Sequence, residues 1–400
     1  MTGSRWSDWS RAARLATAAA LLASGPVSAQ APAKADGPGV RLSGFVSFSF
    51  FGQDRLFGPG NGQNALVVAA VQDGPDGWWH GGDVRNTRLV LDVGVPAVGD
   101  WAVGGLVELD LFGGFPSGEA FDREQAYPRL RLAYAEFERG GTLVRLGQDW
   151  GPITHDMPES VNQLAFPPGW ASAAVIGWRF PGVFLSQQVT ALDGIGVTLH
   201  AAAMRGDWIG DEAEPERPTA GQATLMPQLQ GALELAAEEA AWPWALRIGG
   251  HADRKGAPSP EAESPPSGWA VAGSGRLEPG PLTLLAGGYV GHAVGHLGAQ
   301  VAQLGDIRGR GGWGQAGLAL GGGWSVWGFG GVDSPDSEDV GEGEIVQNRT
   351  VVLMLQHAAG PYAAGLEWQN VRTDRWGDAA RTARDRRHGN QVALGVVVQF

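Results

Sequence analysis

The last eleven residues of the chain, 390–400, read NQVALGVVVQF and alternate between two kinds of side chain. Positions of one parity are apolar throughout: Val392, Leu394, Val396, Val398 and Phe400. Positions of the other parity are mostly small or polar: Gln391, Ala393, Gly395 and Gln399. Because successive side chains of a strand point to opposite faces, this pattern predicts a strand with one apolar face and one polar face.

The same period-two alternation returns in short stretches along the chain from Arg41 onward. Clear examples are 88–95, 129–134 and 195–202. Many of these stretches run about 9–11 residues, which is the length of a tilted strand that crosses a bilayer. The chain is therefore predicted to be all-β.

The connections between the predicted strands alternate in length. Short turns are predicted at 96–100, 139–141, 193–194, 239–242, 279–281, 321–322 and 359–361. Long polar loops are predicted at 52–83, 113–128, 151–181, 206–221, 255–268, 293–312, 333–346 and 373–388. This interleaving gives sixteen strands with both chain ends on the short-turn side. It predicts a transmembrane antiparallel up-and-down β-barrel, whereas a soluble sandwich or propeller has no need of alternating turn lengths.

The composition excludes several other classes. There is no Cys, so disulfide scaffolds and metal–thiolate or Cys-nucleophile chemistry are ruled out. No apolar run approaches the ~18 residues of a membrane helix. Gly makes up 64 of the 400 residues, and charged residues only 18%. A closed barrel accounts for these features, because it pairs every backbone group internally and its curved sheet accepts Gly.

The N-terminus indicates export. Three Arg precede the short apolar stretch 15–23, and small residues follow at 25–29. This pattern predicts a cleaved signal peptide, 1–29, followed by a disordered lead-in, 30–40, and by the barrel, 41–400. The expected location is the outer membrane of a Gram-negative cell. The net charge of −13 makes nucleic acid an unsuitable partner.

Four segments resemble the trimeric porins of Gram-negative outer membranes, most closely the DcaP-like group. They are Val84–Leu89, Leu106–Gly113, Leu130–Phe137 and Thr142–Trp150, the last ending in Gly-Gln-x-Trp. The resemblance covers about 41–190. It implies a homotrimer without a cofactor, in which the loop after the fifth strand, 151–181, folds into the barrel as a constriction. The terminal Phe400 resembles the signal read by the barrel-assembly machinery.

The strand phase selects candidate pore-lining residues. If Leu89, Leu132 and Leu146 face lipid, four arginines form a basic wall in the lumen: Arg88, Arg129, Arg131 and Arg145. Arg247 and Arg276 are expected to face the lumen on later strands. Four carboxylates are expected to oppose the wall and to set a transverse field: Glu108, Asp110, Asp156 and Glu159. Because guanidinium groups bind carboxylates bidentately, the expected function is passive diffusion of small hydrophilic solutes that favours small organic anions, such as dicarboxylates or aromatic acids.

Two other readings of a barrel stay open: a non-selective or cation-preferring porin, and a plugged structural or adhesin barrel. Acidic outer segments at 211–216 and 333–344 suggest contact with divalent cations and lipopolysaccharide. Motifs that would indicate nucleotide binding, metal binding or catalysis are not supported by the sequence around them. The GxGxxG at 309–314 lies in no strand–helix unit, glycines argue against a metal-binding helix carrying His292 and His296, and no nucleophile motif accompanies His200. No catalytic, metal-binding or cofactor-binding residue is therefore predicted.

Overall fold

The structure is a computed structural model that describes residues 38–114, 125–154, 156–192, 194–206, 218–257 and 263–400. The predicted signal peptide, 1–29, lies outside the described residues, as does most of the predicted lead-in. Among the residues that the structure describes, no helix is long and apolar enough to cross a membrane.

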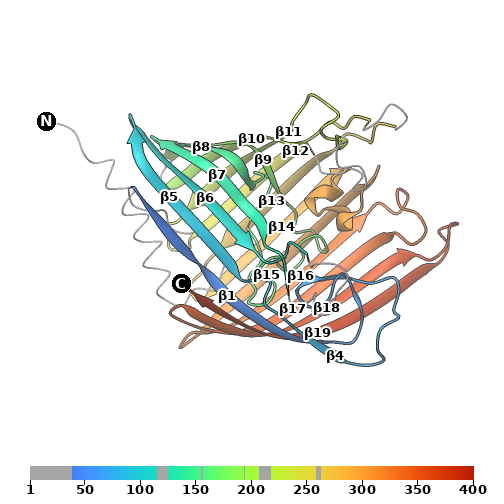
Figure 1. Cartoon of the computed structure of the whole chain (residues 1–400). Coiled ribbons are helices and arrows are strands. Elements are labelled where there is room, and N and C mark those ends of the chain that lie inside the picture. The colour runs from blue at the N-terminus through green and yellow to red at the C-terminus, as the bar shows by residue number, and fades with distance from the viewer. Residues whose placement is uncertain (1–37, 115–124, 155, 193, 207–217, 258–262) are drawn as a thin grey trace.

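The described chain forms one large antiparallel sheet (Figure 1). Its first strands are β1 (Gly39–Gln53), β4 (Trp79–Asp83), β5 (Arg88–Val98), β6 (Trp101–Asp110), β7 (Arg129–Arg139), β8 (Thr142–Trp150), β9 (Arg179–Leu192) and β10 (Ile195–Met204). The sheet continues through β11 (Gln228–Ala237), β12 (Trp244–Ala252), β13 (Trp269–Leu277), β14 (Leu282–His292), β15 (Arg308–Gly321), β16 (Trp324–Pro335), β17 (Ile345–Ala359), β18 (Tyr362–Trp376) and β19 (Arg384–Gln399).

The sheet closes on itself because β1 pairs with β19 on one side and with β4 and β5 on the other. β4 and β5 pair with successive parts of β1 and act as one interrupted strand. With β4 and β5 counted as one strand, the barrel has sixteen strands, and the predicted fold class is confirmed. The last backbone groups also join the closure, since Phe400 and Gly44 exchange two hydrogen bonds of 3.1 Å.

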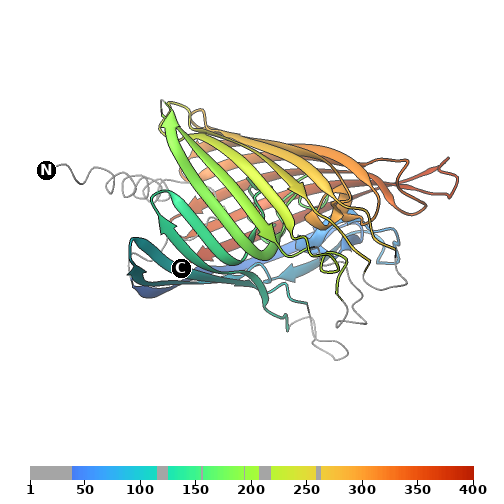
Figure 2. The same ribbon diagram turned by 90° about the horizontal axis from the view of Figure 1, so that it is seen from above.

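Short turns gather at one end of the barrel and long connections at the other (Figures 1 and 2). Two-residue turns join β7 to β8 at 140–141 and β17 to β18 at 360–361. Gly140 and Gly360 have positive φ, a conformation that Gly adopts without steric cost. The predicted alternation of turn lengths is thus present in the structure.

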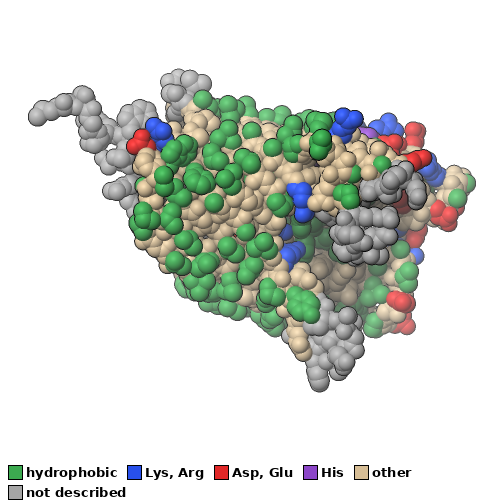
Figure 3. All heavy atoms as spheres, turned by 45° about the horizontal axis from the view of Figure 1, so that its top comes forward, with side chains coloured by type: hydrophobic (Ala, Val, Ile, Leu, Met, Phe, Trp, Pro, Cys, Tyr) green, Lys and Arg blue, Asp and Glu red, His purple; other side chains and the backbone are tan. Residues whose placement is uncertain are grey.

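The outer face of the barrel is apolar. On β5, Leu89 and Leu91 are exposed while Arg88, Val90 and Asp92 are buried. On β19, Val392, Leu394 and Val398 are exposed, as the alternation of the last segment predicts. Figure 3 shows apolar side chains spread over the strands and charged side chains gathered at the long-loop end.

A β-bulge interrupts the alternation on β7. Leu130 pairs with Leu109 and Leu132 with Glu108, so Arg131 is the extra residue. Leu132 therefore stands opposite the buried Glu108, and the expectation that it faces lipid is wrong. The inward-facing positions of β7 change parity at this bulge. Arg131 and Glu136 are five residues apart and would face opposite sides of a regular strand, yet both are buried.

Candidate functional site

The loop 151–178 folds into the barrel and contacts opposite walls, so the predicted inward fold of 151–181 is confirmed, except that 179–181 belong to β9. Most of its described residues are buried. Its hydrogen-bond partners lie on eight of the sixteen strands of the barrel: Ser49, Asn86, Arg88, Gln230, Arg247, Gln315, Asn348, Glu367, Gln369 and Ala393. A segment held from so many directions is an ordered part of the lumen.

Glu367 on β18 is the main anchor of this loop. One carboxylate oxygen, Oε1, accepts hydrogen bonds from Ser160 Oγ at 2.7 Å, Val161 N at 2.8 Å and Asn162 N at 3.0 Å. The loop also packs closely against Gly395 of β19. A Cβ atom added at this glycine would lie only 2.6 Å from Asn162 Oδ1. The tip of the loop therefore rests directly on β18 and β19.

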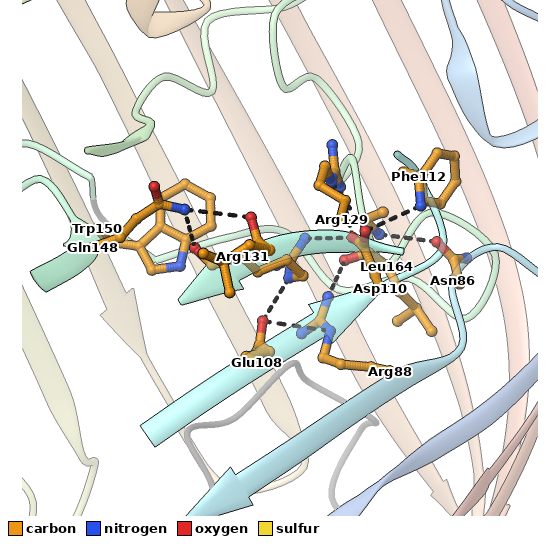
Figure 4. A network of polar contacts seen from close by, with 12 residues as sticks. Asn86, Arg88, Glu108, Asp110, Phe112, Arg129, Arg131, Gln148, Trp150 and Leu164 are labelled. Carbon is orange, nitrogen blue, oxygen red and sulfur yellow. Dashed lines mark hydrogen bonds and ion pairs between the residues drawn. The ribbon is translucent and has the colours of Figure 1, made fainter. Parts of the chain in front are cut away.

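The break between β4 and β5 holds the other side of the loop. Asn86 is fully buried there, donates to Asn162 O at 2.6 Å and accepts from Ala165 N at 3.0 Å. Arg88 donates to Leu164 O at 3.2 Å (Figure 4). Side chains at this interruption and at the start of β5 thus bind the loop.

Three of the predicted arginines converge with two carboxylates on the wall formed by β5, β6 and β7 (Figure 4). Arg131 binds Glu108 at 2.5 Å and Asp110 at 3.0 Å. Arg129 binds Asp110 at 2.6 Å, and Arg88 Nε lies 3.6 Å from Glu108. The sequence placed Glu108 and Asp110 opposite the arginines; the structure places them beside the arginines, because β6 lies between β5 and β7. These five side chains carry one net positive charge.

The four arginines differ in the exposed fraction of their side chains, and so in how accessible they are to a solute. The side chains of Arg88 and Arg131 are 5% and 4% exposed, whereas those of Arg129 and Arg145 are 19% and 28% exposed. Arg145 lies outside the three-arginine cluster and binds Glu136 at 2.7 Å and Asp149 at 2.8 Å. Arg129 and Arg145 are therefore the accessible members of the predicted wall.

Asp156 and Glu159 lie near a second charged group, on β11 to β13. Arg276 lies 4.0 Å from Glu159 and binds Glu278 at 2.5 Å. Arg247 binds Glu234 and also donates to Thr154 O of the loop at 2.9 Å. Burial raises the pKa of the Glu159 carboxyl to about 7, and the nearby Arg276 offsets this only in part.

Aromatic rings also surround the accessible guanidinium of Arg129. It lies over Phe112 at 5.4 Å and over Phe166 of the loop at 5.1 Å. Arg179 lies against Trp150 and Trp178 at 4.8 and 4.4 Å. The sequence did not identify Phe112, Phe166 and Arg179 as neighbours of the wall. Strand phase does not predict the contacts of the loop residues Phe112 and Phe166, and Arg179, the first residue of β9, fell within the predicted loop 151–181.

Other sequence expectations also change. Asp333 was assigned to an acidic outer segment, but its side chain is fully buried and accepts a hydrogen bond from Tyr289 at 2.6 Å. The other acidic segment, 211–216, lies outside the described residues. His200 does have Ser186 Oγ 2.8 Å from its Nδ1, but Glu234 is 3.8 Å from its Nε2. That distance is longer than a hydrogen bond.

Comparison with solved structures places this barrel among outer-membrane channels in fold. The channel DcaP of Acinetobacter baumannii has a TM-score of 0.68 and 17% identity, covering 93% of this chain and 100% of that one. An anion-selective porin from Comamonas acidovorans has a TM-score of 0.58 and 14% identity, with coverage of 90% and 99%. Salmonella typhi OmpF has a TM-score of 0.56 and 10% identity, with coverage of 91% and 98%. No protein-family model matches the chain, and no curated protein matches it significantly. The resemblance to DcaP-like porins is thus confirmed at the level of fold.

Proposed function

We propose that this chain is a porin of a Gram-negative outer membrane that lets small hydrophilic solutes diffuse passively. The closed barrel, its apolar outer face and its fold support this proposal, because only a closed sheet satisfies its backbone in lipid. The same fold likeness supports a homotrimer, and Phe400 supports recognition by the barrel-assembly machinery. Acidic side chains at 336–344 are suited to divalent cations and lipopolysaccharide at the cell surface.

The preferred solutes in this proposal are small organic anions. The observation that carries it is the partly exposed guanidinium of Arg129, in a cluster of three arginines and two carboxylates beside the constriction loop. Asp110 holds Arg129 in place, and the excess positive charge attracts anions in a site shielded from bulk water. The carboxylates around Glu159 lie on the other side of the lumen. The electric field across the lumen therefore points from the arginine cluster toward them.

Arg129→Gln and Arg145→Gln are each expected to lower the anion-to-cation permeability ratio by a factor of roughly two to five, because each removes a charge that solutes can reach. The reversal potential across a KCl gradient in a planar bilayer measures this ratio, and current block by dicarboxylates tests binding. Arg139→Gln is the matched control, since Arg139 is 55% exposed beside a short turn and pairs with Asp100. Equal effects of all three substitutions, or a cation-preferring wild-type pore, would contradict the assigned role of the arginines.

The selectivity is also expected to depend on pH through Glu159. Because the pKa of this carboxyl is about 7, raising the pH from about 6 to 8 adds a negative charge to the loop and moves the reversal potential toward cations. Glu159→Gln is expected to abolish the shift; a shift that persists would assign it to another group. The folded pKa lies above the ordinary value of 4.5, so the stability contributed by this group is complete below about pH 4.5 and is lost as the pH rises through about 7.

A closed structural barrel is a second candidate, favoured by the contacts of the loop with opposite walls. In that case the folded protein, recognised by its heat-modifiable mobility on a gel, conducts no current in a planar bilayer. Steady conductance from the same preparation excludes this candidate.

A further inference from the structure

A second polar cluster lies near the long-loop end of the barrel. It contains His251 at the end of β12, Asp253 just beyond it and His296 in the short 3-10 helix η3 (Gly295–Leu297). Asp253 Oδ2 lies 3.0 Å from His251 Nε2 and 3.4 Å from His296 Nε2. One ligand atom from each residue fits within 4.8 Å of the others. All three side chains are at least 97% buried.

Both oxygens of the Asp253 carboxylate have partners. Oδ1 accepts hydrogen bonds from Gly268 N at 2.7 Å and Lys255 Nζ at 3.0 Å, and Oδ2 also accepts one from Lys255 Nζ at 3.2 Å. The ammonium of Lys255 is also held by Pro266 O at 3.3 Å and Ala293 O at 3.0 Å. Gly268 N therefore holds Oδ1, while Oδ2 faces the two imidazoles and also contacts the Lys255 ammonium, a positive charge that opposes a metal ion at this oxygen.

We propose that His251, Asp253 and His296 bind a divalent first-row transition metal ion, with Zn²⁺ the best fit. Zn²⁺ takes His nitrogen and carboxylate oxygen at about 2.0–2.2 Å in tetrahedral geometry, which separates ligand atoms by roughly 3.4 Å. The distance from Asp253 Oδ2 to His296 Nε2 matches this spacing, and the distance to His251 Nε2 is 0.4 Å shorter. The sequence excluded a His292–His296 pair on one helix; the fold instead joins His296 to residues more than forty positions earlier in the chain.

The site connects to both ends of the constriction loop. Gln230 lies between His251 and the loop: its Oε1 accepts from Ile153 N at 3.0 Å, so its Nε2 donates to His251 Nδ1 at 3.1 Å. Metal binding through His251 Nε2 moves the ring proton to Nδ1 and breaks this hydrogen bond with Gln230. Next to His296, Leu297 O accepts from Gly177 N at 2.7 Å. On β12, Arg247 donates to Thr154 O at the start of the loop. A metal ion that cross-links the end of β12 to η3 thus holds together elements that contact both ends of the loop.

Titration of the purified, folded barrel with Zn²⁺, by calorimetry and by metal analysis after gel filtration, tests the site. The expected result is one ion per chain and a higher temperature for the heat-modifiable transition. His251→Gln and His296→Gln should each weaken binding at least about 100-fold, as expected for loss of a ligand. Lys255→Gln should tighten binding at least about tenfold, because it removes a positive charge beside the ion.

His292→Gln is the matched control, since His292 pairs with Asp306 in the same loop region but outside the cluster. Its affinity for Zn²⁺ should equal that of the wild type. Binding that survives His296→Gln, binding weakened equally by His292→Gln, or fewer than one ion per chain would overturn the proposal. If the histidine variants fail to fold, Lys255→Gln still decides: affinity that is unchanged or weaker contradicts a metal beside Asp253.

Discussion

Glu367→Ala is expected to release the constriction loop from the barrel wall and to raise single-channel conductance and current noise. Glu367 Oε1 is the acceptor for Ser160 Oγ, Val161 N and Asn162 N, all in buried surroundings. A buried donor that loses its partner costs about 1–3 kcal/mol. Loss of three bonds should therefore lower the free energy of unfolding by roughly 3–5 kcal/mol. Bilayer recordings and denaturant unfolding in detergent measure the two effects.

Glu367→Gln is the matched control for this prediction. The amide keeps an acceptor oxygen at the position of Oε1, so conductance should stay close to that of the wild type. Gln369→Ala offers a comparison on the same strand, since Gln369 binds only the side chain of Gln163 in the loop, at 2.5 Å. If Glu367→Ala leaves conductance and noise unchanged while the barrel remains folded, the loop is held mainly by its other contacts.

The architecture could be predicted because its signals are local. Alternation in 390–400 and the difference between the short turn predicted at 139–141 and the long loop predicted at 151–181 are visible without any knowledge of partners. Position 367 also carries a local signal: Glu367 and Gln369 alternate with Leu366 and Trp368, which marks them as lumenal. Their role as anchors has no local signal, because their partners lie about 200 positions away.

The electrostatics of the site could not be predicted because they depend on register between strands. Alternation identified Arg131 and Glu108 as lumenal, but only the pairing of β6 with β7 shows that they are neighbours. The bulge at Arg131 is likewise a property of two strands, since the extra residue is defined by what its partner strand lacks. Strand phase therefore predicted which arginines enter the lumen, and not which of them a solute can reach.

Arg131→Gln is expected to act on stability rather than on selectivity. Its guanidinium is 4% exposed and binds both Glu108 and Asp110, whose side chains are 8% and 0% exposed. Removing one partner of a buried ion pair leaves uncompensated charge and typically costs about 3–5 kcal/mol. Arg129 and Arg88 remain beside the two carboxylates, which places the expected loss at the lower end of this range.

The charge-balanced double variant separates this cause from loss of packing. Glu108→Gln combined with Arg131→Gln removes one charge of each sign. The double variant should therefore lose less free energy of unfolding than the two single variants lose in sum, by about 1–3 kcal/mol. Denaturant unfolding of the four proteins in detergent gives this coupling energy. Strict additivity, or an Arg131→Gln barrel as stable as Arg139→Gln, would show that the buried cluster does not depend on Arg131. In that event the accessible pair, Arg129 and Arg145, would still carry the proposed selectivity, because neither needs Arg131 to face the lumen.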